Sequence, residues 1–157
     1  MAYKIVIDAS AALKWQFEDE TEAEQAVNVL LDYKDDKVSF VVPELFYYEL
    51  ANAIHIAVQR ERITEDDGKD IINDMLAIET TVVDSLELIR KAYINARRYK
   101  ISVYDSMYFT FAADKGILLL TGDKRFFNAF KDRGKFIRWI GDYTYFSDFT
   151  KGQLSYE

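Results

Sequence analysis

Hydrophobic positions along the chain alternate between short continuous runs, typical of buried strands, and spaced sets, typical of helices. The continuous runs predict strands at 3–8, 38–42, 79–84, 117–121 and 136–140. The segments between them predict helices at 21–33, 43–60, 64–78, 85–98, 105–115 and 124–130. Strands that alternate with helices in this way predict an α/β fold with a mainly parallel central sheet of four to five strands, flanked by helices.

Two of the predicted helices carry start signals. Pro43 suits the first position of a helix, because its missing N–H would have no partner there in any case. Thr64 opens the sequence Thr-Glu-Asp-Asp, which is a helix start of capping-box type. Helical spacing also predicts which residues of these segments face the core. They are Leu50, Ile54, Ala57 and Val58 in one helix, and Ala26, Val27, Leu30 and Leu31 repeat at the same spacing in the helix at 21–33.

The composition fits one compact domain. Half of the 157 residues are hydrophobic and 15% are aromatic, while a single Pro and six Gly leave little linker material. The absence of Cys excludes a disulfide scaffold and any thiolate metal site. No apolar run approaches the ~20 residues of a membrane helix, and the N-terminus has no signal-peptide pattern. We therefore expect a cytoplasmic protein with no membrane partner.

Charge is unevenly distributed along the chain. The net charge of −7 argues against a protein that coats nucleic acid non-specifically. Residues 18–36 nevertheless carry eight acids and one base, whereas residues 124–138 carry six bases and one acid. Arg97, Arg98 and Lys100 form a further basic cluster. Two interpretations stay open: two solvated faces, or a basic rim for a polyanion beside an acidic surface.

Four carboxylates stand at positions where a parallel sheet would bring them together. Asp8 ends the first predicted strand, and Asp123 follows the strand at 117–121. Asp105 opens the helix before that strand, and Glu49 lies in the helix after the second strand. Ligands of open α/β sheets bind outside the carboxyl ends of the strands, so these side chains are candidates for one site. Alternatively, the aspartates are helix caps and Glu49 is a solvated helix residue.

Converging carboxylates would need a cation, because like charges a few ångströms apart repel strongly. An all-oxygen ligand set favours Mg²⁺ or Mn²⁺ over Zn²⁺. Such an ion activates water and neutralises a leaving oxygen, which indicates metal-dependent phosphodiester hydrolysis. Ser10 and Thr121 would hold the carboxylates or metal waters in place, or they are ordinary hydroxyls at strand ends.

Other residues offer less. His55, the only histidine, lies about 120° around its helix from Glu49, so we expect a structural or surface role. The aromatic residues near Asp105 are expected in the core, with base stacking by Tyr104 or Tyr108 as the alternative. The last residues, 141–157, include Tyr143, Tyr145, Phe146 and Phe149, which would pack on the domain, bind a partner or stay unpacked.

The ordered segments "IVIDAS", "PELFYYELANA", "YDSMYFTFAADKG" and "LLLTGD" together resemble the PIN-domain ribonucleases, and most closely the VapC toxins of toxin–antitoxin pairs. The resemblance covers about residues 4–140. It implies a three-layer PIN-like domain over 1–140, with 141–157 as an aromatic C-terminal extension of the same domain or a tail. The long helical arm of the family would correspond to residues 44–78.

The resemblance also implies an activity and partners. Asp8, Glu49 and Asp105 match the three principal acidic positions of the family, Asp123 the fourth, and Thr121 the hydroxyl before it. It implies Mg²⁺- or Mn²⁺-dependent cleavage of RNA, a homodimer and a cognate antitoxin protein. We therefore expect an endoribonuclease, the toxin of a type II toxin–antitoxin pair. The cations expected to contact RNA phosphates are Arg98, Lys124 and Arg125.

Three alternatives belong to other functional classes. A catalytically silent PIN-like module would bind protein or RNA without cutting it. A receiver-like phosphoacceptor would need an acidic pair at the first strand, where Asp8 stands alone. A phosphatase with a nucleophilic Asp would need a second Asp at the position of Ser10.

Overall fold

The computed structural model describes residues 1–17 and 19–149. Its described residues form one sheet of five parallel strands in the order β3-β2-β1-β4-β5. The strands are β1 (Tyr3–Ile7), β2 (Val38–Pro43), β3 (Thr80–Val83), β4 (Leu118–Thr121) and β5 (Ile137–Trp139). The predicted α/β class, with a mainly parallel sheet of four to five strands, is confirmed.

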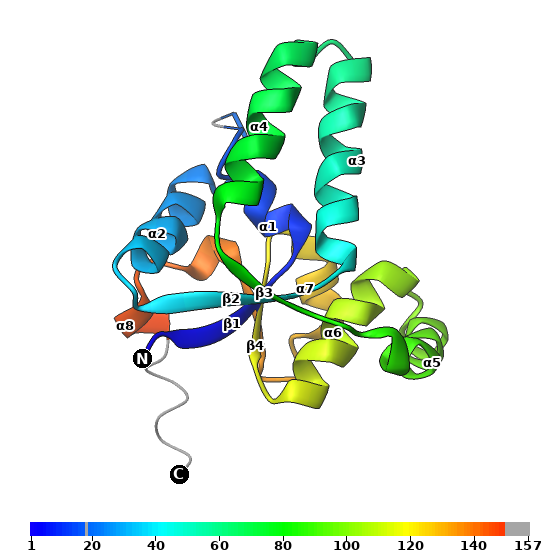
Figure 1. The fold of residues 1–157 in the computed structure, drawn as a ribbon. Coiled ribbons are helices and arrows are strands. Elements are labelled where there is room, and N and C mark those ends of the chain that lie inside the picture. The colour runs from blue at the N-terminus through cyan, green and yellow to red at the C-terminus, as the bar shows by residue number, and fades with distance from the viewer. Residues whose placement is uncertain (18, 150–157) are drawn as a thin grey trace.

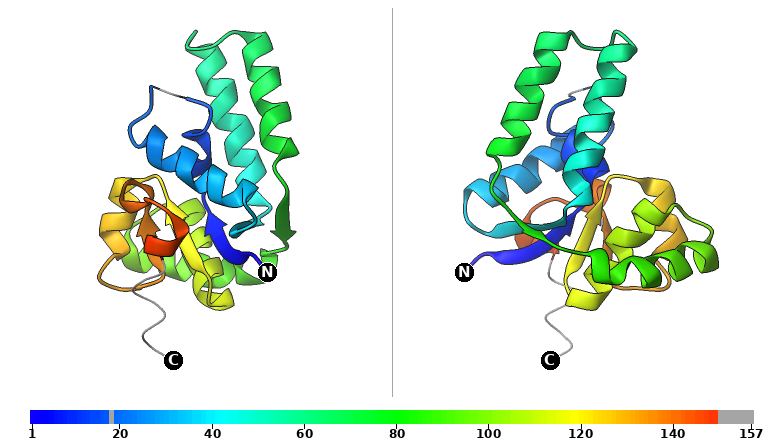
Figure 2. Two further views of the ribbon diagram at one scale, coloured as in Figure 1. Left: turned by 90° about the vertical axis from the view of Figure 1, so that its left-hand side faces the viewer. Right: turned by 45° about the vertical axis from the view of Figure 1, so that its right-hand side comes forward.

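Helices cover both faces of the sheet (Figures 1 and 2). Helices α5 and α6 pack on each other on one side, and α1 to α4 lie on the other side, where α3 and α4 form an arm that projects away from the sheet. The helices are α1 (Ala9–Leu13), α2 (Ala23–Lys34), α3 (Leu45–Gln59), α4 (Glu65–Ala77), α5 (Ile89–Tyr99), α6 (Val103–Lys115), α7 (Lys124–Phe130) and α8 (Phe146–Phe149), with short 3₁₀ turns η1 (Leu86–Leu88) and η2 (Ile140–Asp142).

Burial of the sheet between two layers of helices explains the hydrophobic run in the central strand β1. Its last three residues, Ile5, Val6 and Ile7, have no solvent exposure, because helices cover both faces of the sheet. A parallel strand that is buried on both faces reads as a continuous hydrophobic run rather than an alternating one. The run therefore ends where the sheet ends, and the residue that follows, Asp8, stands at the rim.

Strand order creates a switch point beside Asp8. The chain runs from β1 outward through β2 to β3, then returns across the sheet to place β4 on the other side of β1. Connections that leave two adjacent strands in opposite directions open a crevice at their carboxyl ends, which is where ligands of such sheets bind. Asp8 directly follows β1, and Asp123 follows β4 by two residues.

Two local expectations were wrong. Pro43 is the last residue of β2 rather than the start of a helix, because it stays extended to pair in register with Val83 of β3. In α2, Val27 and Leu31 are 44% and 46% exposed, while Val29 and Asp32 face the core. The inward face of this helix therefore carries a charge that the spacing of hydrophobic residues did not indicate.

Other expectations were confirmed. Leu50, Ile54 and Ala57 of α3 are buried, and Val58 beside them is partly buried. The capping box at Thr64 is present: its hydroxyl accepts from the Asp67 N–H, and the Asp67 carboxylate accepts from the Thr64 N–H.

The described beginning of the C-terminal extension packs against the sheet and α2. Tyr143 has no exposed surface, and its hydroxyl donates to Asp32 Oδ2 at 2.7 Å. The ring of Phe146 lies 5.3 Å from that of Tyr3, whereas Tyr145 is 52% exposed. The rest of the extension, residues 150–157, and Glu18 of the acidic segment lie outside the described residues. Within the described part, no helix is both long and apolar enough to cross a membrane.

Candidate active site

Asp8 lies at the centre of a hydrogen-bond cluster at the switch point. Its Oδ1 accepts from the Ser10 hydroxyl at 2.6 Å and from the Ala11 N–H at 2.9 Å, and its Oδ2 accepts from the Thr121 hydroxyl. Asp8 therefore caps α1, as the alternative interpretation held, and is also fixed to the end of β4. Its side chain is almost completely buried, and burial raises the pKa of Asp8 although these hydrogen bonds oppose the rise.

Asp123 is fixed from the other strand by similar contacts. Its Oδ1 accepts from the backbone N–H groups of Arg125 at 2.8 Å and Phe126 at 3.0 Å, so it caps α7. Its own N–H donates to Thr121 Oγ1, the same hydroxyl that donates to Asp8. The Thr121 hydroxyl is thus hydrogen-bonded both to the carboxylate of Asp8 and to the backbone N–H of Asp123, which fixes the two residues relative to each other.

Gly122 allows the two strand ends to approach each other. A Cβ at this position would lie 2.7 Å from the Ser10 carbonyl oxygen and 2.8 Å from Lys14 Cε. Carbon atoms do not approach backbone that closely, so only glycine fits between β4 and α1. The Gly122 N–H donates to Ser10 Oγ at 3.0 Å, which completes the link between the strands.

Asp105 and Glu49 reach the same region from α6 and α3. Asp105 stands in the first turn of α6, but Ser102 caps that helix, so the alternative interpretation of Asp105 as a helix cap was wrong. Burial raises the pKa of Asp105, and the charge of Asp123 adds to the rise, while the Ser102 hydroxyl and Arg125 oppose it. Asp105 and Asp123 also line one cavity, so their carboxylates face the same space.

Glu49 is partly buried, so the alternative of a solvated helix residue was also wrong. Burial raises the pKa of Glu49 to about 7, with the hydrogen bond from Tyr108 opposing and the charges of Asp8 and Asp105 adding. Electrostatic coupling therefore runs from Asp8 to Glu49, from Glu49 to Asp105, and from Asp105 to Asp123. Carboxylates that raise one another's pKa are typical of functional sites.

Tyr108 is the participant that the sequence did not identify. It is 1% exposed, as expected for a core residue, yet its hydroxyl donates to Glu49 Oε2 at 2.7 Å. Burial, followed by the charge of Glu49, raises the pKa of the phenol well above its usual value. The spacing of Asp105 and Tyr108, three residues apart on one helix, was the only available signal, because such residues share a face.

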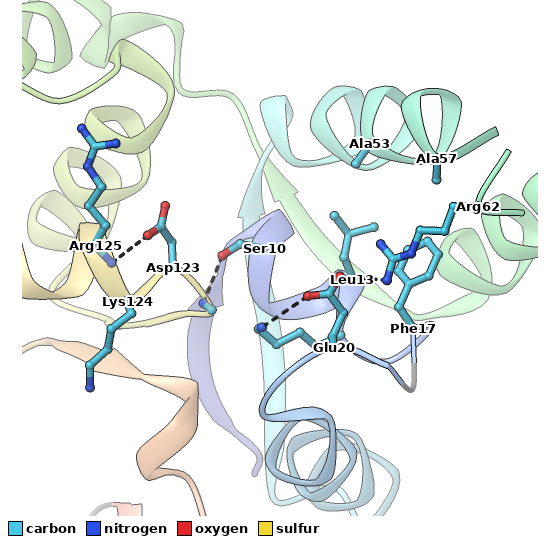
Figure 3. A pocket seen from close by; sticks show the side chains of 12 residues that line it. Ser10, Leu13, Phe17, Glu20, Ala53, Ala57, Arg62, Asp123, Lys124 and Arg125 are labelled. Atoms are coloured by element: carbon cyan, nitrogen blue, oxygen red, sulfur yellow. Dashed lines mark hydrogen bonds and ion pairs between the residues drawn. The ribbon is translucent and has the colours of Figure 1, made fainter. Parts of the chain in front are cut away.

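Two cavities adjoin the carboxylates. One, of about 310 Å³, is lined by Asp105, Asp123 and Arg125 among others. The other, of about 470 Å³, contains Ser10, Asp123 and Arg125 together with residues of α3. Figure 3 shows the second cavity. Asp123 and Arg125 line both cavities, so a continuous surface passes over this end of the sheet.

The expected RNA-contacting cations differ in placement. Arg125 is exposed beside Asp123 and lines both cavities. Lys124 extends away from Asp123 in Figure 3, and its Nζ lies 3.3 Å from the ring centroid of Trp139. Arg98 is exposed in the last turn of α5. Arg125 is therefore the one of the three that faces the carboxylates, and it lowers the pKa of Asp105.

Two further cations line the larger cavity but are already paired. The Nζ of Lys14 lies 3.1 Å from Glu22 and 3.8 Å from Glu20. The guanidinium of Arg62 contacts Asp19 at 2.7 Å and Glu20 at 3.0 Å. Part of the acidic segment thus neutralises cations that line the larger cavity, so it is not simply a solvated face.

The donor set fits a hard divalent cation in its chemistry. It consists of carboxylate and hydroxyl oxygens. Burial raises the pKa values of Glu49 and Asp105, and repulsion from neighbouring carboxylates adds to the rise; a bound cation would relieve that repulsion. Within residues 1–17 and 19–149, however, no three acidic or histidine side chains lie close enough to hold one ion between them. A cation bound by these side chains would therefore also have water molecules among its ligands.

Comparisons with known proteins agree with this fold. The model of the PIN domain family matches residues 5–131. Among curated proteins, no sequence matches the chain. The solved structure of PAE2754 from Pyrobaculum aerophilum is similar, with 19% identity, a TM-score of 0.64 and coverage of 89% of this chain and 92% of that one.

Two other solved structures are also similar. Mycobacterium tuberculosis VapC20, titled a sarcin-ricin loop cleaving toxin, has 15% identity and a TM-score of 0.60, with 80% of this chain and 95% of that chain covered. A toxin–antitoxin complex from Klebsiella pneumoniae has 14% identity and a TM-score of 0.50, with coverage of 78% and 89%. At these identities the likeness concerns the fold.

Proposed function

The chain belongs to the PIN-domain family, and we propose that it is a metal-dependent endoribonuclease, the toxin of a type II toxin–antitoxin pair. The observation that carries the proposal is the electrostatic coupling of Asp8, Glu49, Asp105 and Asp123 at the carboxyl ends of β1 and β4. Similarity to a sarcin-ricin loop cleaving toxin and to a toxin–antitoxin complex supports the assignment.

Each residue of the site has a role in this proposal. Asp8 and Asp105 are the central ligands of Mg²⁺ or Mn²⁺, and Glu49 and Asp123 complete the site directly or through water. The bound cation would supply Lewis acidity, which activates water and neutralises charge on the leaving oxygen.

The supporting residues fix these ligands and the RNA. The Ser10 and Thr121 hydroxyls hold the Asp8 carboxylate in one orientation. Arg125, which lines both cavities, would contact an RNA phosphate. Lys124, which lines the larger cavity, and Arg98, in the last turn of α5, would contact further phosphates.

Partners follow from the same proposal. A cognate antitoxin would cover the surface that joins the two cavities, and the chain would form a homodimer. Growth of a bacterial host tests the toxin assignment: expression of the wild type arrests growth, and expression of Asp8→Asn does not. Sedimentation of the purified chain tests the dimer.

The direct test is cleavage of a labelled RNA pool by purified protein with Mg²⁺, with Mn²⁺ and with EDTA. Asp8→Asn and Asp105→Asn are expected to lower the rate at least ~100-fold, because each removes a ligand. Asp70→Asn, which changes an exposed aspartate on α4, is the matched control and is expected to cut like the wild type. Cutting that continues in EDTA would contradict metal dependence.

One observation favours a second candidate, a PIN-like module that binds RNA or protein without cutting it. This is the lack, among the described side chains, of a group of three that is close enough to hold an ion. Such a module would bind Mn²⁺ weakly and leave RNA intact under every metal condition. The same cleavage experiment, with Mn²⁺ binding measured in parallel, separates the two candidates.

A further inference from the structure

Tyr108 connects three segments of the candidate site through one oxygen atom. Its hydroxyl donates to Glu49 Oε2 on α3 at 2.7 Å. The backbone N–H of Ala9, the residue next to Asp8, lowers the pKa of the same hydroxyl, against the larger effects of burial and of Glu49, which raise it. Because Tyr108 belongs to α6, its ring ties α3 and the start of α1 to the helix that carries Asp105.

This contact restricts Glu49 to one arrangement. A phenol has a single proton to donate, and here Glu49 Oε2 accepts it. Among the described residues, no hydrogen bond to Glu49 Oε1 is present, so this oxygen is available to a ligand. Without the phenol, the partly buried side chain of Glu49 would have several rotamers, and only some would point toward Asp8.

From this geometry we propose that Tyr108 is a positioning residue, which holds Glu49 Oε1 ready for the divalent cation by fixing Glu49 Oε2. The inference rests on the proposed nuclease function, because it assumes that Glu49 takes part in binding the ion. It assigns a role in the site to a residue of the buried core, which acts only through Glu49.

The molecule offers a matched control for this role. Tyr143 is also buried, and its hydroxyl also donates to a carboxylate, Asp32 Oδ2, at 2.7 Å. That pair lies between α2 and the C-terminal segment and touches none of the four carboxylates of the site. Tyr108→Phe and Tyr143→Phe therefore each remove one buried phenol oxygen from a carboxylate, and only the first removal affects the site.

The experiment measures Mn²⁺ binding by calorimetry on the full chain, and RNA cleavage as a function of Mn²⁺ concentration. Tyr108→Phe is expected to weaken Mn²⁺ binding roughly 10–100-fold, the range for loss of a hydrogen bond to a metal ligand. Its cleavage rate should recover at high Mn²⁺, because the chemical groups remain. Tyr143→Phe should bind Mn²⁺ like the wild type.

A double variant tests whether Tyr108 acts through Glu49. Adding Tyr108→Phe to Glu49→Gln should change Mn²⁺ affinity less than about threefold, because the residue to be positioned is already altered. If the two changes instead multiply, Tyr108 acts by another route and the proposal is overturned.

The remaining outcomes are also distinct. Wild-type affinity in Tyr108→Phe, with cleavage intact, overturns the positioning role and leaves the nuclease assignment standing. Equal weakening by Tyr143→Phe overturns it too, because the effect would then be a general loss of packing. A wild type that neither binds Mn²⁺ nor cuts RNA overturns both proposals.

A second measurement needs no folded Tyr108 variant. Wild-type protein carrying ¹³C at the tyrosine ζ carbons is titrated with Mg²⁺, and Tyr143→Phe identifies the control signal. The Tyr108 signal should shift because its acceptor changes charge environment, while the Tyr143 signal stays in place. An unchanged Tyr108 signal at saturating Mg²⁺ overturns the proposal.

Discussion

Two buried tyrosines of this molecule make the same bond in different surroundings. Tyr108 donates to Glu49 and Tyr143 donates to Asp32, each at 2.7 Å. Asp32 also accepts from Lys37 Nζ at 3.0 Å and from the Phe146 N–H at 2.7 Å. Glu49 has the charges of Asp8 and Asp105 nearby instead.

The neighbours decide the direction in which each pKa moves. Burial alone would raise the pKa of Asp32, but the bonds from Tyr143, Lys37 and Phe146 outweigh it, and the pKa is lowered. Around Glu49 the neighbouring carboxylates add to the effect of burial, and the pKa rises to about 7. The charge of Asp32 is therefore balanced by donors within the fold, whereas the carboxylates around Glu49 repel one another, and the proposed cation would relieve that repulsion.

Removing the balanced carboxylate should have the largest effect on stability. Asp32→Ala removes the acceptor of the buried Tyr143 hydroxyl and of the partly buried Phe146 N–H, so we expect the free energy of unfolding to fall by about 3 kcal/mol. Urea denaturation measures it. Asp35→Ala is the control: its carboxylate also contacts Lys37, at 3.2 Å, but is 63% exposed, and the loss should stay below about 0.5 kcal/mol.

Binding of a divalent cation among the four carboxylates of the candidate site should stabilise the fold. At a Mn²⁺ concentration of 100 times the dissociation constant, the free energy of unfolding of the wild type should rise by about 2.7 kcal/mol. Thermal denaturation with Mn²⁺ and with EDTA measures the difference. Asp105→Asn should lose most of it, and a rise of equal size in this variant would place the ion elsewhere.

Lowering the pH should weaken the contribution of Asp32 to the stability of the fold. Because the folded state lowers the pKa of Asp32, its contribution to stability is complete above the unfolded value near 3.9 and is lost as the pH falls through the folded value. The slope that one such group adds is at most about 1.4 kcal/mol per pH unit. Asp32→Asn should flatten the stability profile below about pH 4, as followed by urea denaturation; an unchanged profile would contradict the pairing.

The smallest expected effect is a gain. Glu49→Gln removes a charge from among carboxylates while its amide oxygen still accepts from Tyr108, so the metal-free protein at pH 8 should be more stable by about 0.5–1 kcal/mol. The same change should lower RNA cleavage. A loss of stability would mean that the carboxylate of Glu49 is already balanced within the fold.

The order of strands and acids along the chain was enough to predict part of the site. Asp8 and Asp123 follow hydrophobic runs that could only be buried strands, and parallel strands place their ends at one edge. Asp105 needed the further assumption that its helix returns to that edge. Asp8 and Asp123 are also helix caps. A sequence pattern that indicates a helix cap therefore does not exclude that the same residue belongs to the candidate site.

The contacts of Tyr108 and Asp32 could not be predicted, because they join residues far apart in sequence. Tyr108 meets a carboxylate 59 positions away, and Tyr143 meets one 111 positions away. The position of Tyr108 in its helix indicates only a hydrophobic core residue. Asp32 belongs to an acidic segment whose carboxylates are all expected to be solvated. Lys124 is similar: its ring partner Trp139 belongs to the next strand, and nothing local indicates that the cation turns away.

The link between α2 and the C-terminal segment also constrains how the chain is made. Of the five strands of the sheet, β1 is synthesised first, but it is the central strand and one of its two neighbours is β4. The carboxylate of Asp32 acquires its partners later still, because it accepts from the Tyr143 hydroxyl and the Phe146 N–H. Native contacts of such long sequence separation form late and slowly. The end of the sheet that carries the candidate site is therefore assembled only after β4 has been synthesised, so a nascent chain that stops before β4 has no finished site.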